Sequence, residues 1–532
     1  MTDAAAPPLS RRALLELIGL SAGGTAMHQA MMSLGFAAES PYRGPIKLEG
    51  DPKGASVVVL GAGLAGMTAA FELRQAGYQV QVLEYNSRPG GRNWTLRGGD
   101  VYTELGGAAQ ACEFDAGLYF NPGPWRIPYH HHAILDYCRK FGVALEPFIQ
   151  LNHNAYLHSA KAFGGKPQRI REVKTDFDGG VSELLAKAVR KGALDDAASK
   201  EDQEILLEAL RSLGALDKEF RYRAGATSAE YRGYAKDPGG GLDAAPVSGE
   251  LIGIHDILTS RLWFGLQNFL RYDFQTTMFQ PVGGMGRIGE AFANQLQGVI
   301  RLGAKVTGVR QDDSGVSVHF EDLSAGSAPQ EARADWCVCT LPLTILSQLP
   351  IDVSARMKAA IDAVPYVGAV KFGLQFSRRF WEEDEQIFGG ITYTDLPIRQ
   401  ISYPSAGCNA GGKGVLLGGY VFGGAAAFEF TAMSPSERLE RALDYGAQIH
   451  PPYRSAFENG ISVAWHRAPF TLGCAGDWSD EARREHYDDL CQIDGRIVLA
   501  GEHASLIPAW QEGAILSALD AVSRLHQRAL AQ

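Results

Sequence analysis

The stretch from Asn121 to His132, NPGPWRIPYHHH, carries two kinds of side chain that could do chemistry. Its three consecutive histidines offer imidazole ligands for a metal ion, and Arg126 offers a planar fork for an anion. Helical metal pairs need two ligands spaced by three or four residues. Pro128 and Gly142 fit the first turn and the end of one helix, on which consecutive histidines diverge by about 100°. We therefore expect no metal site, and at most one histidine facing an active site.

A glycine turn after an apolar segment predicts where a dinucleotide binds. The sequence from Ser56 to Glu84 begins with apolar residues 57–60, which are typical of a parallel strand buried on both faces. Gly61 permits a tight turn, and Gly63 lets the backbone approach a pyrophosphate. Gly66 lets the next helix pack on the strand.

The residues after these glycines complete a Rossmann-like unit. A helix is expected over residues 64–75, ended by Gly77, and a second strand over residues 79–83. Glu84 then stands where a carboxylate accepts hydrogen bonds from the adenosine ribose. An acid at this position would repel a 2′-phosphate, so NADP is not expected.

A second glycine turn, RPGGR, directly follows this unit. Arg88, Gly91 and Arg92 can place backbone and guanidinium groups around the same diphosphate. A GxGxxG turn followed by RxGGR resembles the flavin-containing amine oxidase family. The resemblance implies an α/β fold: a discontinuous Rossmann-like FAD-binding domain, an α+β substrate-binding domain and a helical insert.

The same resemblance, with the expected elements, divides the chain into domains. The FAD-binding domain is expected over residues 50–125, 265–345 and 485–532, the helical insert over 145–262, and the substrate-binding domain over 346–484. Within the FAD-binding domain the resemblance implies two further contacts. Glu502 takes the position beside the ribityl chain or phosphate, and the backbone of Val306 contacts the adenine. A helix from Gln511 is expected to point its positive end at the flavin ring.

The closest resemblance is to the L-amino acid oxidases. Their Gly-Pro-x-Arg-x-Pro run, followed by a helix ending in Arg-Lys-Phe-Gly, matches residues 123–142. It implies that Arg126 pairs with the substrate α-carboxylate and that Tyr403 supports the same carboxylate. Lys371 matches the lysine near flavin N5 that assists the reaction with O2. Ala509, whose carbonyl can accept from the substrate amine, stands where the family usually has glycine, and Trp510 matches a cavity wall.

The implied activity is FAD-dependent oxidation of L-amino acids to 2-oxo acids, ammonia and H2O2. Two alternatives share the architecture: an amino acid 2-monooxygenase, which releases an amide and CO2, and a monoamine or polyamine oxidase. A non-catalytic flavoprotein is a third. Cys474 stands like the cysteine that links to flavin in monoamine oxidases, yet L-amino acid oxidases generally bind FAD without that bond, so noncovalent FAD is expected. A broad apolar side-chain pocket and a homodimer or higher homo-oligomer are the family's usual features.

Composition and the N-terminus bear on partners and location. The net charge of -10 disfavours a nucleic acid partner. Arg11 and Arg12 precede an apolar run too short to span a bilayer, which resembles a Tat export signal within residues 1–45. We expect a periplasmic or secreted protein without a stable membrane anchor; without export, the protein would be cytoplasmic.

Overall fold

A six-stranded sheet carries the glycine turn. The computed structural model describes residues 40–242 and 244–532, and the sheet order is β14–β2–β1–β18–β27–β26. Its strands are β14 (Ile300–Arg301), β2 (Gln79–Leu83), β1 (Ser56–Leu60), β18 (Trp336–Cys339), β27 (Ile497–Leu499) and β26 (Ile493–Asp494). All pairs are parallel except β26 with β27. This is the expected α/β arrangement, with strands drawn from three distant parts of the chain.

The two faces of β1 are buried under different layers. Val57 and Val59 pack in a core with helices α3 (Leu64–Gln75) and α18 (Gln511–Leu530), whereas Val58 packs in the core formed with β15, β16 and β17. These last three strands, Ala304–Asp312, Gly315–Asp322 and Ala328–Ala334, form an antiparallel meander. The continuous apolar run of β1 is explained by this burial on both faces.

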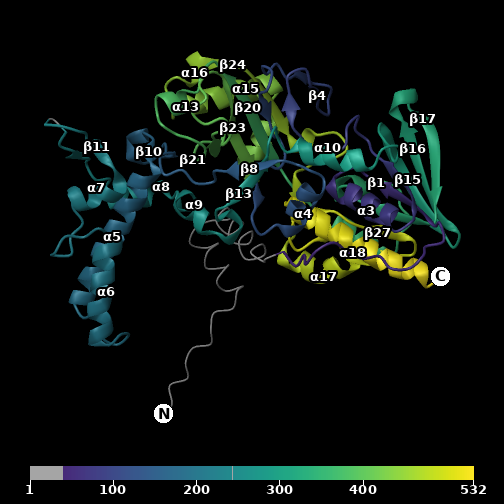
Figure 1. Cartoon of the computed structure of the whole chain (residues 1–532), viewed down its shortest axis with the longest axis horizontal. Helices are drawn as coiled ribbons and strands as arrows, with labels where there is room; N and C mark the ends of the chain where they lie inside the picture. The colour runs from purple at the N-terminus through teal and green to yellow at the C-terminus, as the bar shows by residue number, and fades with distance from the viewer. Residues whose placement is uncertain (1–39, 243) are drawn as a thin grey trace, which may run out of the picture.

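A seven-stranded sheet forms the second large unit, in the order β10–β9–β21–β22–β23–β20–β24. Its strands are β10 (Gln168–Arg169), β9 (Tyr156–His158), β21 (Ile391–Thr394), β22 (Gln400–Ser402), β23 (Gly414–Phe422), β20 (Ala369–Phe376) and β24 (Phe457–Ala464). Every residue of β20 is buried. Helices α13 (Phe380–Glu383), α15 (Pro435–Gly446) and α16 (Tyr453–Ala456) lie around this sheet (Figure 1), and α14 (Gly424–Ala432) contacts β20 and β23.

The expected helical insert is helical only in part. Residues 145–169 contain β8 (Leu145–Phe148), β9 and β10. Strand β8 pairs with β13 (Met278–Pro281), and β9 pairs in parallel with β21, so both partners lie far along the chain. The helices that follow are α5 (Ile170–Arg190), α6 (Lys200–Leu213), α7 (Ala226–Arg232), α8 (Ile254–Ser260) and α9 (Trp263–Gln267). Helices α5, α6 and α7 form an arm that extends away from both sheets (Figure 1). Ser199 caps α6 by accepting from Asp202 N–H, as its sequence indicates.

The helix expected from Pro128 begins later. Residues Ile127–Pro128 form strand β7, an edge strand that pairs with β13 (Met278–Pro281), where a proline costs no ladder hydrogen bond. Helix α4 runs from His132 to Lys140. The strand pairing is a long-range contact that local spacing does not reveal.

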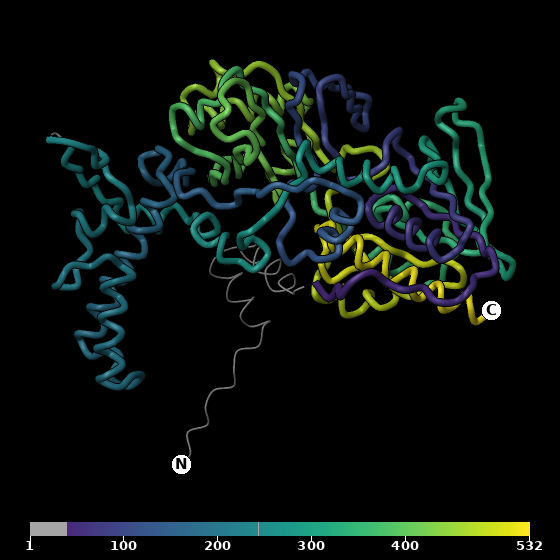
Figure 2. The backbone as a smooth tube through the Cα atoms, viewed as in Figure 1, coloured from purple at the N-terminus to yellow at the C-terminus, as the bar shows by residue number. Residues whose placement is uncertain are grey.

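The first described residues run beside the C-terminal helix (Figure 2). The Ser40 hydroxyl donates to Glu512 at the start of α18, and the Glu49 carbonyl is hydrogen-bonded to His526 near its end. The twin-arginine segment itself lies outside the described residues. None of the helices that the structure describes is long and apolar enough to cross a membrane.

Candidate active site

The two glycine turns expected to surround a diphosphate lie side by side. Gly61 has φ = 98°, which favours glycine, and a side chain at Gly66 would lie 1.9 Å from the Gly61 carbonyl oxygen. A side chain at Gly63 would meet no atom within 4 Å, so the backbone there faces open space. Gly63 bridges to Gly90, whose N–H donates to the Ala62 carbonyl at 2.8 Å. This cradle fits a dinucleotide pyrophosphate.

Glu84 places its carboxylate beside this cradle. It follows β2 and is buried; Ala62 N–H donates to Oε2 at 2.6 Å, and Asn86 N–H donates to Oε1 at 2.8 Å. Oε1 also accepts from Asn86 Nδ2 at 2.6 Å, so Oε2 is the oxygen that keeps acceptor capacity for a ribose hydroxyl. The Glu84 carbonyl accepts from Ala304 N–H at 2.8 Å, which brings the start of β15 alongside. Val306, two residues further on, is buried; its contact with adenine stays a prediction.

The arginines of the second glycine turn have different partners. Arg88 donates to the Gly91 carbonyl at 2.9 Å and lies 4.1 Å from the centre of the Trp94 ring. Burial lowers the pKa of Arg88 to about 10, although nearby Glu84 opposes the shift. Arg88 therefore supports the shape of the turn through its hydrogen bond to Gly91.

Arg92 joins the second glycine turn to the loop before α18. It donates to Glu502 Oε1 at 2.6 Å and to the Cys474 carbonyl at 2.7 Å. Glu502 also accepts from the N–H groups of Gly476 at 3.2 Å and Ala509 at 3.0 Å. Burial alone would raise the pKa of Glu502, but the charge of Arg92 holds it below its ordinary value. The ionised carboxylate of Glu502 thus joins three loops, those that contain Arg92, Gly476 and Ala509.

Ala509 and Trp510 lie at the start of α18. Ala509 has φ = 64°, a left-handed value that a glycine would adopt without strain. The Trp510 ring lies edge-on to His131 at 5.0 Å and 6.1 Å from Phe274, measured between ring centres. One of the three histidines therefore does contact an expected site residue.

Arg126 is buried without a counter-charge. Its Nη1 donates to Gln150 Oε1 at 2.9 Å, and its guanidinium carbon lies 4.8 Å from the Trp125 ring centre and 4.4 Å from that of Phe274. Among the described residues, no carboxylate forms an ion pair with Arg126, and its Nε has no hydrogen-bond partner. Burial lowers the pKa of Arg126 to about 10. The site has donors that an anionic ligand would satisfy.

Lys371 lies beside the same aromatic rings. It is buried in β20, donates to the Gly123 carbonyl, and places Nζ 4.9 Å from the Trp125 ring centre and 4.5 Å from that of Tyr420. Burial, with a smaller contribution from the charge of nearby Arg126, lowers the pKa of Lys371 to about 7. Arg126 and Lys371 therefore lie close enough for the charge of Arg126 to affect the pKa of Lys371.

Tyr403 is placed differently from the role that the resemblance implies. Its hydroxyl is hydrogen-bonded to Thr392 at 2.6 Å and to His450 Nε2 at 2.8 Å, deep in the core of the seven-stranded sheet. Two other tyrosines, Tyr393 and Tyr420, lie close enough to raise the pKa of Arg126. Thr392 and Tyr393 are neighbours on β21, so their side chains lie on opposite faces of that strand.

The sequence reasoning missed the aromatic residues and Gln150 around Arg126. Trp125 adjoins Arg126 in the GPWR run, which is a signal that could have found it. Phe274 and Gln150 reach the site from distant segments and carry no local signal. Tyr393 lies ten residues before Tyr403, and strand alternation alone does not say which of the two tyrosines faces the arginine.

Two of the histidines are buried before α4 begins. His131 is the residue that precedes the helix, and His130 Nε2 lies 3.7 Å from Asp273 Oδ1. Burial lowers the pKa of His131 well below its ordinary value. In the described parts of the chain, no group of three or more His, Cys, Asp or Glu side chains is placed to hold a metal ion.

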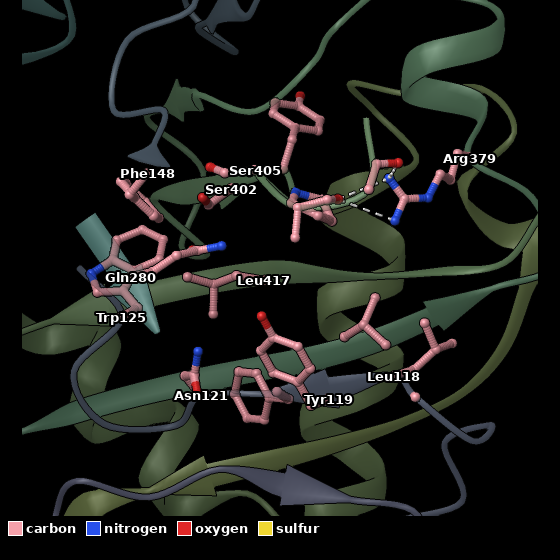
Figure 3. A pocket seen from close by; sticks show the side chains of 17 residues that line it. Leu118, Tyr119, Asn121, Trp125, Phe148, Gln280, Arg379, Ser402, Ser405 and Leu417 are labelled. Carbon is pink, nitrogen blue, oxygen red and sulfur yellow. Dashed lines mark hydrogen bonds between the residues drawn. The ribbon is translucent and has the colours of Figure 1, made fainter. Parts of the chain in front are cut away.

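A cavity of about 290 Å³ is lined in part by Trp125 (Figure 3). Its walls include Asn121, Phe148, Ser402 and Tyr403. Neither Arg126 nor Lys371 lines it, so the cavity adjoins the Arg126 site through the Trp125 ring without containing its charged groups.

Comparisons with known proteins agree with this arrangement. The model of the family described as flavin containing amine oxidoreductase matches residues 64–526. A putative L-amino-acid oxidase of Bacillus subtilis (strain 168) is 28% identical, with 87% of this chain and 93% of that protein covered. An L-amino-acid oxidase of Siganus canaliculatus is 30% identical, with 89% and 86% covered.

A solved structure shares the fold. Cyclohexylamine oxidase from Brevibacterium oxydans IH-35A superposes with a TM-score of 0.59 at 16% identity, covering 90% of this chain and all of that one. The sequence-based prediction of family and fold is confirmed, and the cradle and its acid fit the flavin that the family carries. The chain belongs to the flavin containing amine oxidoreductase family.

Proposed function

We propose that the protein is an FAD-dependent L-amino acid oxidase. The observation that carries this is the buried Arg126 guanidinium, which has no carboxylate partner among the residues that the structure describes. A buried unpaired charge is costly, and the α-carboxylate of an amino acid matches a guanidinium fork in a bidentate manner. An amine without a carboxylate would leave this cost in place. Relatives that are named L-amino-acid oxidases support the assignment.

The side chains divide the work of binding and orientation. Arg126 holds the α-carboxylate, and Gln150 fixes the guanidinium through its hydrogen bond. The carbonyl of Ala509 accepts from the neutral amine, and Trp510 closes one side of the site. This arrangement presents Cα–H in one orientation. Bound FAD supplies the acceptor for the hydride that leaves Cα.

The overall reaction takes an L-amino acid, O2 and water to a 2-oxo acid, ammonia and H2O2. No side chain is needed as a base once the amine is neutral. Lys371 holds a proton on Nζ below about pH 7, and this positive charge favours the negative charge that develops on O2 during its reduction.

The test replaces Arg126. We expect Arg126→Ala to lower kcat/KM for L-amino acids by about a hundredfold or more, because the substrate carboxylate loses its partner. The measurement is peroxide release over the twenty L-amino acids, with D-isomers and decarboxylated amines as controls. Arg139→Ala, which removes an exposed arginine on α4, is the matched control and should leave activity unchanged.

The products and substrates separate the alternatives. An amide and CO2 without peroxide would identify a 2-monooxygenase. Activity on amines that survives Arg126→Ala would identify an amine oxidase. If no amino acid or amine bleaches the flavin under anaerobic conditions, the protein is a non-catalytic flavoprotein.

We propose that the FAD is noncovalent. Burial raises the pKa of the Cys474 thiol to about 11, although Arg92 and Lys371 oppose the shift, so the thiolate needed for attack is scarce at neutral pH. Acid precipitation should leave a colourless protein pellet and a yellow supernatant. A yellow pellet would implicate Cys474.

Location and assembly complete the proposal. The twin arginines support Tat-dependent export, so replacing Arg11 and Arg12 with lysine should keep the protein in the cytoplasm.

A homodimer is supported by exposed apolar side chains on the α5–α6 arm, among them Leu184, Ile205 and Leu213. Light scattering after size-exclusion chromatography measures this directly.

A further inference from the structure

A second arginine, Arg271, lies beside the Arg126 site. It stands between the short 3-10 helices η2 (Asn268–Leu270) and η3 (Tyr272–Phe274) and is half-buried. Its guanidinium carbon lies 5.0 Å from the Phe274 ring centre and 5.7 Å from that of Phe264. Over residues 40–242 and 244–532, no hydrogen bond or ion pair engages its side chain.

The two arginines share one phenyl ring. The guanidinium carbon of Arg126 is 4.4 Å from the centre of Phe274, and that of Arg271 is 5.0 Å from the same centre. The charge of Arg271 contributes to the lowered pKa of Arg126, because the two positive charges repel each other. Lys371, which lies against Trp125 as Arg126 does, adds a third basic side chain near Arg126.

Negative charge near these cations is scarce. Asp273 raises the pKa of both arginines but forms no ion pair with either among the described residues; its Oδ1 lies 3.7 Å from His130 Nε2. The buried amide Nε2 of Gln150 also lacks an acceptor in the described structure. One substrate α-carboxylate satisfies Arg126 and leaves Arg271 unmatched.

We propose that the preferred substrates are acidic L-amino acids, with the α-carboxylate on Arg126 and the side-chain carboxylate on Arg271. The proposal rests on the proposed oxidase function and narrows its substrate class. It replaces the broad apolar pocket that the family resemblance implies. Both guanidinium groups lie against Phe274, where an apolar side chain would have to pack beside two poorly compensated charges.

The experiment compares each acid with its uncharged amide. Peroxide release by the FAD-loaded enzyme is measured with L-glutamate against L-glutamine and with L-aspartate against L-asparagine. We expect kcat/KM to favour at least one acid over its amide by about fiftyfold, because only the carboxylate forms a charge-assisted pair. Arg271→Gln should lower kcat/KM for that acid by about a hundredfold and change kcat/KM for its amide less than about threefold.

Two further variants make the result specific. Arg271→Lys keeps the charge but not the fork and should retain part of the preference for the acid. Arg333→Gln removes a far more exposed arginine on β17 and should leave every ratio unchanged. Flavin absorbance per protein confirms that each variant is folded and loaded.

The outcomes distinguish this proposal from the function on which it rests. If neutral L-amino acids are oxidised and kcat/KM for each acid is equal to or lower than that for its amide, the acidic preference is overturned. The oxidase function then still stands. An acid-to-amide ratio that Arg271→Gln does not change overturns the role of Arg271. If none of the L-amino acids gives peroxide release, the oxidase function itself is overturned.

Discussion

At the scale of single residues, the site is an uncommon concentration of buried cations around aromatic rings. Lys371 and Arg126 both lie against Trp125, and burial lowers the pKa of each. Cation–π contacts offset part of the lost hydration, but not all of it. The cost of these charges is the physical reason to expect an anionic substrate.

Lys371 gives a prediction of pH-dependent stability. Its folded pKa of about 7 is below the ordinary value of 10.5, so between these values the folded state binds fewer protons than the unfolded state. Stability attributable to this group therefore rises with pH through that window and is lowest below about pH 7. Lys371→Met should raise Tm at pH 6 by about 2–5 °C and by less at pH 9.

The control for this pH effect is Lys218→Met, which removes an exposed lysine. Its effect on Tm should be small and the same at both pH values. A Lys371→Met shift that does not depend on pH would contradict the lowered pKa.

Ala509 gives a prediction about backbone strain. Its φ of 64° costs an alanine about 1 kcal/mol more than a glycine. Ala509→Gly should therefore leave Tm unchanged or raise it, which is unusual for this substitution. The same change at Ala209, exposed inside α6, should destabilise its helix by about 0.5–1 kcal/mol. Equal losses at both positions in thermal unfolding would show that Ala509 is unstrained.

At the scale of elements, Glu512 holds together the start of two helices and the first described segment. The fully buried carboxylate on α18 accepts from the N–H groups of Ala133 and Ile134, both at 2.9 Å, at the start of α4. The Ser40 hydroxyl donates to it as well. The positive end of α4 and the start of α18 thus share one anion.

Removing this carboxylate should destabilise the fold. Glu512→Ala leaves two buried N–H groups without acceptors and should lower stability by about 2–4 kcal/mol in denaturant unfolding. Glu201→Ala, an exposed first-turn acid of α6, should change stability by less than about 0.5 kcal/mol. A loss of similar size for both variants would argue against the shared capping role.

At the scale of the whole molecule, the flavin cradle is assembled from segments far apart in the chain. The first glycine turn, the RPGGR turn and the loop around Glu502 meet through backbone and ion-pair contacts. A ligand that touches all of them stabilises the folded state by mass action. The family's flavin is therefore expected to contribute to the stability of the entire FAD-binding domain.

Flavin removal tests this coupling. The flavin-free protein should have a lower Tm than the loaded protein, and Tm should rise with added FAD. Gly63→Val should abolish the rise without lowering the flavin-free Tm, because its side chain enters open space. Gly66→Ala should lower the flavin-free Tm too, because its side chain meets the Gly61 carbonyl oxygen. A flavin-independent Tm in the unaltered protein would contradict the coupling.

Much of the fold could be predicted where the signal is local. Helix α3, strand β2 and the β15–β16 hairpin follow from apolar runs, glycines and the turn at 313–315, because short-range sterics decide them. The order of the sheet and the strands within residues 145–169 could not be predicted in this way. Strand β8 pairs with β13 and β9 pairs with β21, and a pairing between distant segments leaves no local pattern.

The sequence by itself determined the dinucleotide cradle, its acid and the family, because glycine spacing and the order of elements are local requirements. It also singled out Arg126. Only the tertiary structure decided what surrounds that arginine: Gln150, Phe274 and Arg271 come from separate segments, and the hydroxyl of Tyr403 turns to His450 instead. Long-range packing sets which side chains share a buried site, and with it which charges lack a partner.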